Sequence, residues 1–593
     1  MGKILVSNNS GWSERLREFF FNSGFNVNFE NDKLVVYDKL NVHVENCVQI
    51  GDTVIASNGT FVYKNLIGRE ALIDLYSDYE QCGKKIKSIR ANCFGSYLIL
   101  IKENNSITAF VDEAGTYAMY YYSDKDSYLM TNTYYHIALV TGRDISRISN
   151  IEEFLEFCII DNETPFKDVY RLLGDEVIRI HNQQLCVEKV CVNHNELRNT
   201  EFESAANQIK DEIIKYTEKM RLFSEKPVLF MTGGVDSRLS LATYLAASMK
   251  PVLCSWGGNY LKMNTKDADA DVSNKIATEE NLEFRYIDVS ESDAYEVDEI
   301  SVDRFDKYGE WATIYGNNNK WFALFENNED FTYEFGYFGE IIKGWEILDS
   351  ISKDSLTIDE FCKIYTGRQS YHFDSKSMFD MYEYKRTVHA KIKKISQKLG
   401  FDDSKLSREE CMVLYYTYRL HADTKCCNFA NMFGYCSPVL AHKSVADLIN
   451  MCPYEYKQHD RINLYITKMI DSNLLNIEYF THGKYMILDK QSLRLDYLES
   501  DSRKQKLIEI SKKMHVHSLL KKVKSAAKST NTDNAKMLRG YANRINSYQY
   551  FVDSGIVVNE KTFDYIPMAI SMLCQCQMLD SVFKHKELAG KRE

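Results

Sequence analysis

The stretch Pro227-Val-Leu-Phe-Met-Thr-Gly-Gly-Val-Asp-Ser-Arg238 joins an apolar run, two glycines and the start of a helical pattern. Val228 to Met231 have the continuous apolar character of a strand that is covered on both faces. Apolar residues then recur at helical spacing, at Leu239, Ala242, Leu245 and Ala246. The change of period at the glycines predicts a buried strand, a sharp turn and a helix.

This turn has the features of an anion-binding loop. Two glycines remove the β-carbons that would hold a polyphosphate away from the backbone, and the new helix offers unpaired N–H groups and its positive dipole end. Asp236 could hold the Mg²⁺ that accompanies ATP. We therefore expect the nucleotide site to include Met231, Thr232, Gly233, Gly234, Asp236 and Ser237. The structural alternative is a tight turn in which Asp236 or Ser237 only caps the helix.

The string Thr232-Gly-Gly-Val-Asp-Ser237 resembles the S-G-G-x-D-S loop of the ATP-pyrophosphatase family, with threonine in place of the first serine. The resemblance implies an enzyme that cuts ATP between the α and β phosphates, adenylates an oxygen of its substrate and releases pyrophosphate. No Walker-type G-x-x-x-x-G-K-[ST] string occurs in the chain.

The residues that follow continue a strand and helix alternation. Pro251 to Gly257 predict a second strand, and Asp271 to Asp288 predict a helix followed by a third strand. In such an α/β sheet the ligand lies at the carboxyl ends of the strands. Ser255 could contact the adenine there, or Ser255 and Asp271 could simply be capping residues, and both interpretations stay open.

The chain before residue 192 is dominated by short strands, which predict a layered, sheet-rich domain. Three segments, Cys93–Ile101, Ala109–Tyr122 and Tyr128–Asn132, follow one another in an order that resembles the N-terminal glutaminase domain of asparagine synthetase-type amidotransferases. The resemblance implies an α/β chain with an Ntn-hydrolase-like α+β sandwich at 1–195. It implies an adenine nucleotide hydrolase-like (PP-loop) synthetase domain at 200–500 with a helical C-terminal part. The helix formers of the tail predict a separate helical extension at 501–593.

The second residue departs from that family. Its glutaminases use the thiol of a cysteine at position 2, with the α-amine of the same residue as the base. This chain has Gly2, and Cys47, Cys82 and Cys93 are internal. We therefore expect the first domain to release no ammonia from glutamine and to be structural or protein-binding.

The segment Thr332–Trp345 corresponds to the family's S-G-E-G-S-D-E-V-F-G-G-Y motif. The family's metal-binding aspartate falls on Gly339 and its active-site glutamate on Gly336. The resemblance implies that Glu340 takes a catalytic and metal-binding role beside Asp236, with Glu334 as the alternative, and that Gly336 borders the nucleotide. A glycine-rich turn beside a buried strand is the other interpretation of each single residue.

A catalytic lysine is expected farther along the chain. Gly434–Ala441 resembles the family's A-R-V-P-F-L-D, with Ala441 in place of the aspartate, and Leu474–Lys484 resembles the stretch that carries the lysine. A positioned ammonium would stabilise the negative charge that builds up during adenylation and during attack on the adenylate. Lys484 is the candidate, and a solvated loop lysine is its alternative.

Composition excludes several classes of partner. With 593 residues, 73 basic and 84 acidic side chains and a net charge of −11, the chain has no basic run suited to nucleic acid. No apolar run approaches the roughly 20 residues of a membrane span, so we expect no membrane partner and a cytoplasmic location. Fifteen scattered cysteines predict free thiols, and Cys426-Cys427 and Cys574-Gln-Cys576 lack zinc-site spacing.

Together the resemblances imply an ATP- and Mg²⁺-dependent amide-forming ligase. A small-molecule or peptide carboxylate would be adenylated and then attacked by ammonia or by an amine of the substrate. Members of the family without the N-terminal cysteine include β-lactam synthetases and lasso peptide cyclases, and other members amidate sugar carboxylates. The choice among these substrates stays open. A homodimer and a precursor-peptide or protease partner also stay open. An inactive nucleotide-binding scaffold is the alternative from another class.

Overall fold

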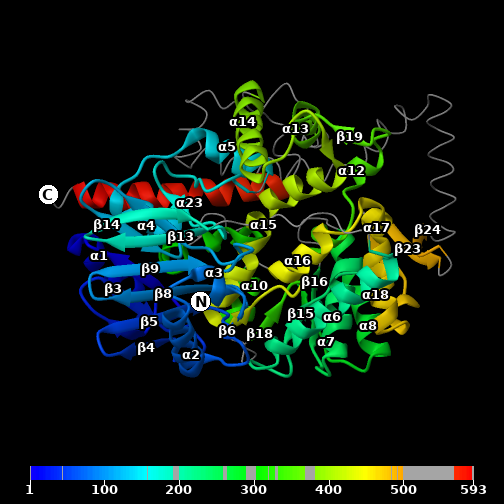
Figure 1. Cartoon of the computed structure of the whole chain (residues 1–593), viewed down its shortest axis with the longest axis horizontal. Coiled ribbons are helices and arrows are strands. Elements are labelled where there is room, and N and C mark those ends of the chain that lie inside the picture. The colour runs from blue at the N-terminus through cyan, green and yellow to red at the C-terminus, as the bar shows by residue number, and fades with distance from the viewer. Residues whose placement is uncertain are drawn as a thin grey trace.

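Two six-stranded sheets, in which every strand pairing is antiparallel, form the N-terminal third of the chain in the computed structural model (Figure 1). The first has the order β12 (Tyr170–Arg171), β10 (Tyr120–Ser123), β11 (Tyr128–Thr131), β1 (Ile4–Ser7), β3 (Leu34–Tyr37), β2 (Val27–Glu30). The second has the order β14 (Gln184–Lys189), β13 (Glu176–His181), β9 (Ser106–Val111), β8 (Tyr97–Glu103), β5 (Thr53–Gly59), β4 (Cys47–Ile50). The structure describes residues 2–42, 45–156, 158–190, 200–257, 264–288, 302–317, 319–326, 332–367, 381–481, 484–489, 492–497 and 566–590.

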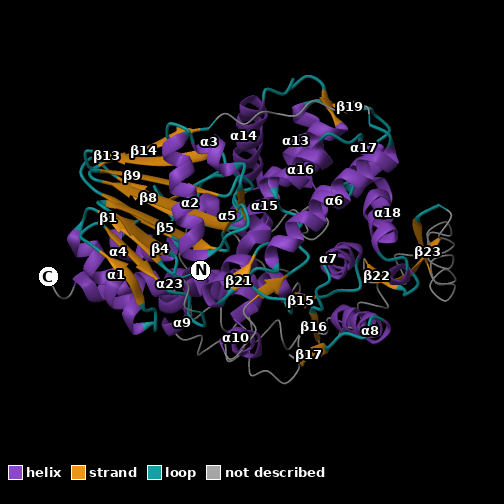
Figure 2. Cartoon of the chain, turned by 60° about the horizontal axis from the view of Figure 1, so that its bottom comes forward, coloured by secondary structure: helices purple, strands orange, loops and turns teal. Residues whose placement is uncertain are grey.

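Strand β8 shows how these layers are stacked. Leu98 and Leu100 are buried in the large core that also contains the strands of the first sheet. Ile99 and Ile101 point the other way, into a core that they share with helix α2 (Gly68–Gln81). Helices α1 (Ser10–Asn22) and α4 (Tyr134–Thr141) pack on the first sheet. The result is a sandwich with helices outside two facing sheets, which agrees with the predicted sheet-rich first part (Figure 2).

A five-stranded parallel sheet forms the centre of the second part. Its order is β17 (Phe284–Asp288), β16 (Val252–Gly257), β15 (Val228–Phe230), β18 (Thr332–Glu334), β21 (Tyr435–Cys436). The chain therefore moves outward from β15 in one direction and then returns to the other side of β15 for β18. At such a reversal the loops after the two central strands diverge and leave a crevice for a ligand.

The central strand β15 is covered on both faces, as its apolar sequence predicts. Leu229 is buried with side chains of α7 (Val235–Ala246) and α8 (Asn264–Glu279). On the opposite face the ring of Phe230 stacks on Phe335, with 4.4 Å between the ring centroids. Because both faces are apolar and covered, this strand fixes the position of the turn that follows it.

Most predicted elements are confirmed, with a local difference near the end of the described region. Helices dominate after residue 354, as expected, including α13 (Ile358–Gly367), α14 (Met381–Leu399), α15 (Arg408–Phe433), α16 (Lys443–Asn450) and α18 (Arg461–Ile470). A small antiparallel sheet then follows, formed by β22 (Tyr479–Thr481), β23 (Lys484–Asp489) and β24 (Arg494–Tyr497). Its aromatic and β-branched residues favour strands over helix. The lysine-rich segment at 501–528 lies outside the described residues.

The C-terminal helix α23 (Ile566–Gly590) packs against the first part of the chain, beside α4 (Figure 1). Ser581 and Tyr135 share a hydrogen bond of 2.8 Å between their hydroxyl oxygens, and the Gln575 amide donates to the Asn150 side-chain oxygen at 2.7 Å. Cys574 and Cys576 are buried in this contact. The described portion of the predicted C-terminal extension is therefore a packed helix.

Helix α15 joins the two parts through buried asparagines. The Asn428 side chain accepts from the Ala118 N–H at 2.9 Å and donates to the Thr116 carbonyl at 3.0 Å. Asn431 accepts from the Thr60 hydroxyl at 2.7 Å. Each of these buried amides has partners on the opposite side of the boundary, so the contact between the two parts is specific as well as apolar.

The same boundary contains a buried lysine. Lys39, 6% exposed, donates to the Gly59 carbonyl at 2.9 Å in the first part, and to the carbonyls of Asn431 and Gly434 in the second, at 3.2 and 2.5 Å. Burial lowers the pKa of Lys39 from 10.5 to about 7, because a charged ammonium is poorly solvated there.

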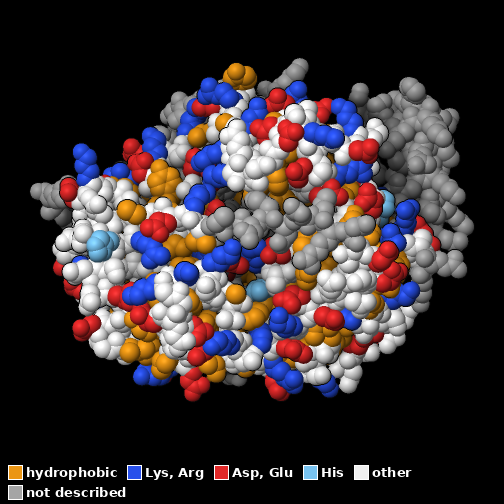
Figure 3. Space-filling model, viewed as in Figure 1, with side chains coloured by type: hydrophobic (Ala, Val, Ile, Leu, Met, Phe, Trp, Pro, Cys, Tyr) orange, Lys and Arg blue, Asp and Glu red, His pale blue; other side chains and the backbone are white. Residues whose placement is uncertain are grey.

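On the face shown in Figure 3, acidic and basic side chains are intermixed over both parts of the chain. Among the described helices, none has both the length and the apolar character required to cross a bilayer.

The lowered pKa of Lys39 predicts a pH dependence of stability. Between pH 7 and pH 10.5 the unfolded chain binds this proton and the folded chain does not, so the free energy of unfolding should rise with pH in this range. Lys39→Met should reduce that slope by up to about 1.4 kcal/mol per pH unit. Urea unfolding between pH 7.5 and 9.5 measures it, with exposed Lys405→Met as the control. An unchanged slope in Lys39→Met would contradict the prediction.

Candidate functional site

The ends of β15 and β16 fix the start of the glycine bend. The Met231 N–H donates to the Cys254 carbonyl at 2.8 Å, and the Ser255 hydroxyl donates to the Met231 carbonyl at 2.6 Å. Met231 and Ser255 are both 1% exposed. In this structure the Ser255 hydroxyl therefore holds the bend in place, and its predicted contact with adenine stays a prediction.

Three N–H groups of the bend bind oxygens of the protein itself. The Gly233 N–H donates to the carboxylate of Asp269 on α8 at 2.8 Å. The Thr232 N–H donates to the Ser237 hydroxyl at 3.2 Å, and the Gly234 N–H donates to the Thr232 hydroxyl at 3.3 Å. A carboxylate oxygen thus already lies at the N-terminal end of α7, where the backbone favours negative charge.

Gly233 is also packed against β22. A β-carbon at Gly233 would lie 2.6 Å from the Phe480 Cβ, so only glycine fits here. The Phe480 N–H donates to the Gly233 carbonyl at 2.9 Å. Lys484 begins β23 and pairs with Thr481, the residue after Phe480. The candidate catalytic lysine therefore lies on a strand whose neighbour touches the bend.

Arg238 positions the segment that leads to β22. Its guanidinium is fully buried and donates to the carbonyls of Leu474, Ile477 and Glu478 at 2.8 to 2.9 Å. The Tyr479 ring lies under the guanidinium, 3.7 Å from its carbon to the ring centroid. The first turn of α7 is thereby joined to the region of Lys484.

The loop after β18 packs against the first turn of α7. Gly336 has a φ of +65°, and a β-carbon there would lie 2.9 Å from the Ser237 Cα. Glu334 is fully buried and accepts from the N–H groups of Gly336 and Val439 at 2.8 and 3.1 Å. Burial raises the pKa of Glu334 to about 7 despite these donors. Its carboxylate joins these two loops, and the Tyr244 hydroxyl of α7 donates to it at 3.4 Å.

Asp236 forms an ion pair at the first turn of α7. Its Oδ2 accepts from the Lys343 ammonium at 2.6 Å, and its Oδ1 accepts from the Asn463 amide at 3.1 Å. Lys343 follows the short helix α11 (Gly339–Ile342), and Asn463 lies on α18. Glu340 is close enough to interact electrostatically with both charges of the pair.

The residues around Asp236 do not fit a protein-bound Mg²⁺. Both carboxylate oxygens of Asp236 have partners, and a β-carbon at Gly339 would lie only 1.9 Å from the Asp236 Cγ. No group of three or more His, Cys, Asp or Glu side chains suited to a metal occurs among the described residues. The Lys343 ammonium already pairs with Asp236, so a Mg²⁺ ligated by this carboxylate would have to displace it.

Sequence reasoning missed four side chains of this site: Arg238, Asp269, Lys343 and Asn463. Arg238 directly follows the loop motif and could have been noticed there. Lys343 lies three residues after Glu340, where its contact with Asp236 depends on the fold of α11. Asp269 and Asn463 have no motif around them, because only packing brings α8 and α18 to the bend.

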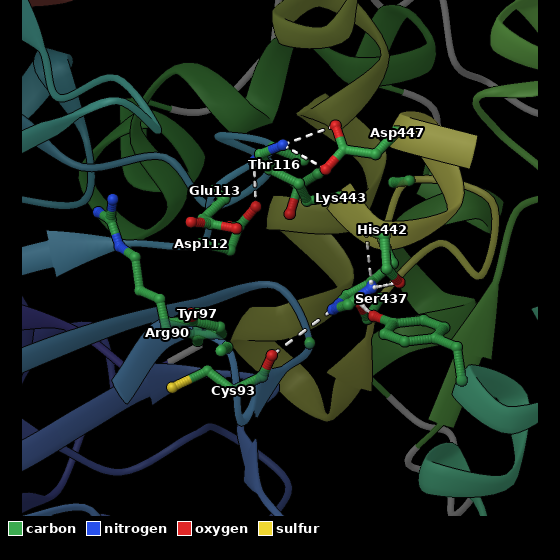
Figure 4. A pocket seen from close by; sticks show the side chains of 16 residues that line it. Arg90, Cys93, Tyr97, Asp112, Glu113, Thr116, Ser437, His442, Lys443 and Asp447 are labelled. Carbon is green, nitrogen blue, oxygen red and sulfur yellow. Dashed lines mark hydrogen bonds and ion pairs between the residues drawn. The ribbon is translucent and has the colours of Figure 1, made fainter. Parts of the chain in front are cut away.

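A second hollow, of about 250 Å³, lies between the two parts of the chain (Figure 4). His442 stacks on Phe94 with ring centroids 5.2 Å apart, and burial lowers the pKa of His442 to about 4. Asp112 accepts from the N–H groups of Thr116 and Tyr117 at 2.9 and 2.8 Å. Because these polar groups are committed to internal hydrogen bonds, we assign them to the joint between the two parts.

The N-terminal position that would hold a nucleophile is closed. Gly2 is buried, and a β-carbon there would lie 1.8 Å from the Tyr37 carbonyl oxygen and 2.6 Å from that of Asp38. The Gly2 carbonyl accepts from the Asn132 amide at 3.1 Å. This backbone path leaves no room for a cysteine side chain.

We predict that Gly2→Cys neither creates glutaminase activity nor is tolerated. The added side chain should destabilise the fold by about 1–3 kcal/mol through overpacking. Glutamate release from glutamine and thermal unfolding measure the two effects. Gly11→Ala is the matched control, since a β-carbon there meets its nearest atom at 3.5 Å. Glutamine turnover by Gly2→Cys would refute this expectation.

We predict that Asp269→Asn strengthens ATP binding about tenfold, because the amide oxygen can still accept from Gly233 while a competing negative charge is removed. Asp271→Asn, at an exposed acid on the same helix, should have little effect. Calorimetric titration with ATP compares the variants. Equal affinity in wild type and Asp269→Asn would show that this carboxylate does not compete with phosphate.

No protein-family model and no curated protein matches the chain. One similar solved structure is glutamine phosphoribosylpyrophosphate amidotransferase from B. subtilis complexed with ADP and GMP, at 9% identity and a TM-score of 0.20. Another, the allosteric regulatory enzyme of purine biosynthesis, has 10% identity and a TM-score of 0.21. Both matches cover 48% of this chain and just under two thirds of the other chains, 65% and 64%. A likeness this low carries no argument, so the family resemblance stays an expectation from the sequence motifs.

Proposed function

We propose that the bend at 231–237 binds the polyphosphate of ATP and that the protein is an ATP-dependent, AMP-forming carbon–nitrogen ligase. The observation that carries the proposal is the place of the bend. It follows the central strand of a parallel sheet at the point where the strand order reverses, and it directs the Gly233 N–H at an anionic oxygen. These are the two properties that polyphosphate binding requires of a strand, loop and helix unit.

The proposed reaction has two steps. A carboxylate oxygen of the substrate attacks the α-phosphorus of ATP, and the bond from that phosphorus to the bridging oxygen breaks, which releases pyrophosphate. Ammonia or an amine then attacks the acyl carbon, AMP leaves with the bonding electron pair, and the nitrogen loses a proton. Thr232, Gly233, Gly234 and Ser237 would hold the phosphates. Lys484 would stabilise the negative charge that develops in both steps.

Particular observations favour a second candidate, a nucleotide-binding scaffold without catalysis. The Asp269 carboxylate occupies the Gly233 N–H, the Glu334 carboxylate is bound by two loops, and Gly2 leaves no space for a nucleophile. The ligase is the first choice because the loop motif is intact in the sequence and none of these groups lies on the strand of Lys484. The two candidates differ in pyrophosphate release.

Gly234→Ala tests the ligase. A β-carbon at Gly234 meets its nearest atom, the Thr232 hydroxyl oxygen, at 3.4 Å, so the fold should accept the methyl group. The methyl would still hinder phosphates that approach the bend, and we expect ATP affinity to fall by about tenfold or more without a change in melting temperature.

The assay is pyrophosphate release from ATP with a panel of amino-acid, peptide and sugar carboxylates. Release by wild type that Gly234→Ala reduces supports the ligase. ATP binding that Gly234→Ala weakens, without release for any carboxylate, favours the scaffold. If wild type and Gly234→Ala bind ATP equally well, the bend has no role in either candidate function.

A further inference from the structure

The ion pair between Lys343 and Asp236 lies where a metal-dependent loop would place its cation. The ammonium is 2.6 Å from the Asp236 Oδ2, and the two side chains are 30% and 20% exposed. Asn463, which is fully buried, holds the other oxygen of Asp236. The aspartate is therefore neutralised and oriented by the protein itself.

The backbone of α11 enforces this arrangement. Gly339 has no β-carbon, and the Asp236 carboxylate fills the space that a side chain would take. Phe338, before the helix, has a φ of +71° in the left-handed region, which turns the chain so that Lys343 leaves α11 toward Asp236. A carboxylate at position 339 and the present ion pair therefore exclude each other.

Lys343 keeps its charge and part of its donor capacity. Burial acts to lower the pKa of Lys343, but the charges of Asp236 and Glu340 outweigh burial and raise that pKa above its ordinary value. An ammonium has three N–H donors, and among the described residues the acceptor it reaches is Asp236. Two donors remain for an anion at the partly exposed face of the pair.

We propose that Lys343 is a phosphate-binding residue that replaces a protein-bound Mg²⁺ at Asp236. Its ammonium supplies, at the first turn of α7, the positive charge that a metal would otherwise bring. The bend then binds a polyphosphate without a metal ligated by the protein. This inference rests on the proposed nucleotide function of the bend and adds the source of its positive charge.

The experiment measures the binding of inorganic pyrophosphate to the full chain by calorimetry, in EDTA and in magnesium chloride. Wild type should bind in EDTA, within about threefold of its affinity in magnesium. Lys343→Met should bind at least about tenfold more weakly in EDTA and recover part of the loss in magnesium, because the Asp236 carboxylate is then available to the ion. Lys343→Arg should bind in EDTA.

Two further variants guard against loss of folding. Lys343→Met leaves Asp236 partly buried without its cation, which can destabilise the fold. The double variant Asp236→Asn/Lys343→Met removes both charges, and we expect it to melt like wild type and to bind weakly in both buffers. Lys353→Met, at an exposed lysine paired with Glu360, should bind like wild type.

The outcomes separate the two proposals. If Lys343→Met and the double variant bind pyrophosphate in EDTA as tightly as wild type does, the role of Lys343 is overturned. The bend then still stands as the proposed phosphate site. Wild type that requires magnesium, or tighter binding by Lys343→Met, also overturns the role of Lys343. If wild type binds neither pyrophosphate nor ATP in either buffer, the proposed function fails together with this inference.

Discussion

The burial of β15 on both faces is the constraint on which the rest of the second part depends. Leu229 and Phe230 face different cores, so the strand can neither rotate nor slip without exposing apolar surface. The chain places β16 on one side of β15 and returns to place β18 on the other. The glycine bend after β15 and the loop after β18 therefore lie next to each other, and Gly336 packs against Ser237 at the start of α7.

The pairing of charges around the glycine bend follows from this arrangement. The bend presents N–H groups and the positive end of α7, and the Asp269 carboxylate accepts from one of them, the Gly233 N–H. The acid that the loop itself carries, Asp236, is satisfied in turn by Lys343. The Asp236 charge thus has a partner of opposite sign, and the Gly233 N–H has a carboxylate acceptor, as buried polar groups require.

The N-terminal sandwich packs against the second part of the chain along a hydrogen-bonded boundary. Asn428, Asn431 and Lys39 connect the sandwich to helix α15 and the loop after it, through hydrogen bonds that cross the boundary. The closed backbone at Gly2 is consistent with a structural role for this sandwich. The neutral His442 and the hydrogen-bonded Asp112 in the hollow between the parts belong to the same joint.

The sequence by itself determined the elements whose patterns are local. The apolar run at 228–231, the glycine turn and the helix after it follow from period and from glycine chemistry, and strands such as β3 and β9 follow from β-branched runs. Strand β14 was missed because it has polar, exposed residues and no buried face to mark it.

Tertiary structure alone decided which charges meet. Lys343 is 107 positions from Asp236, and Asn463 is 227 positions away, so no local pattern could pair them. From the motif alone, the Asp236 carboxylate is interpreted as a metal ligand. Only the fold shows that Lys343 and Asn463 lie against its oxygens. Local sequence predicts secondary structure because short-range sterics act between neighbouring residues. The chemistry of a buried charge depends instead on contacts that form only when the chain is packed.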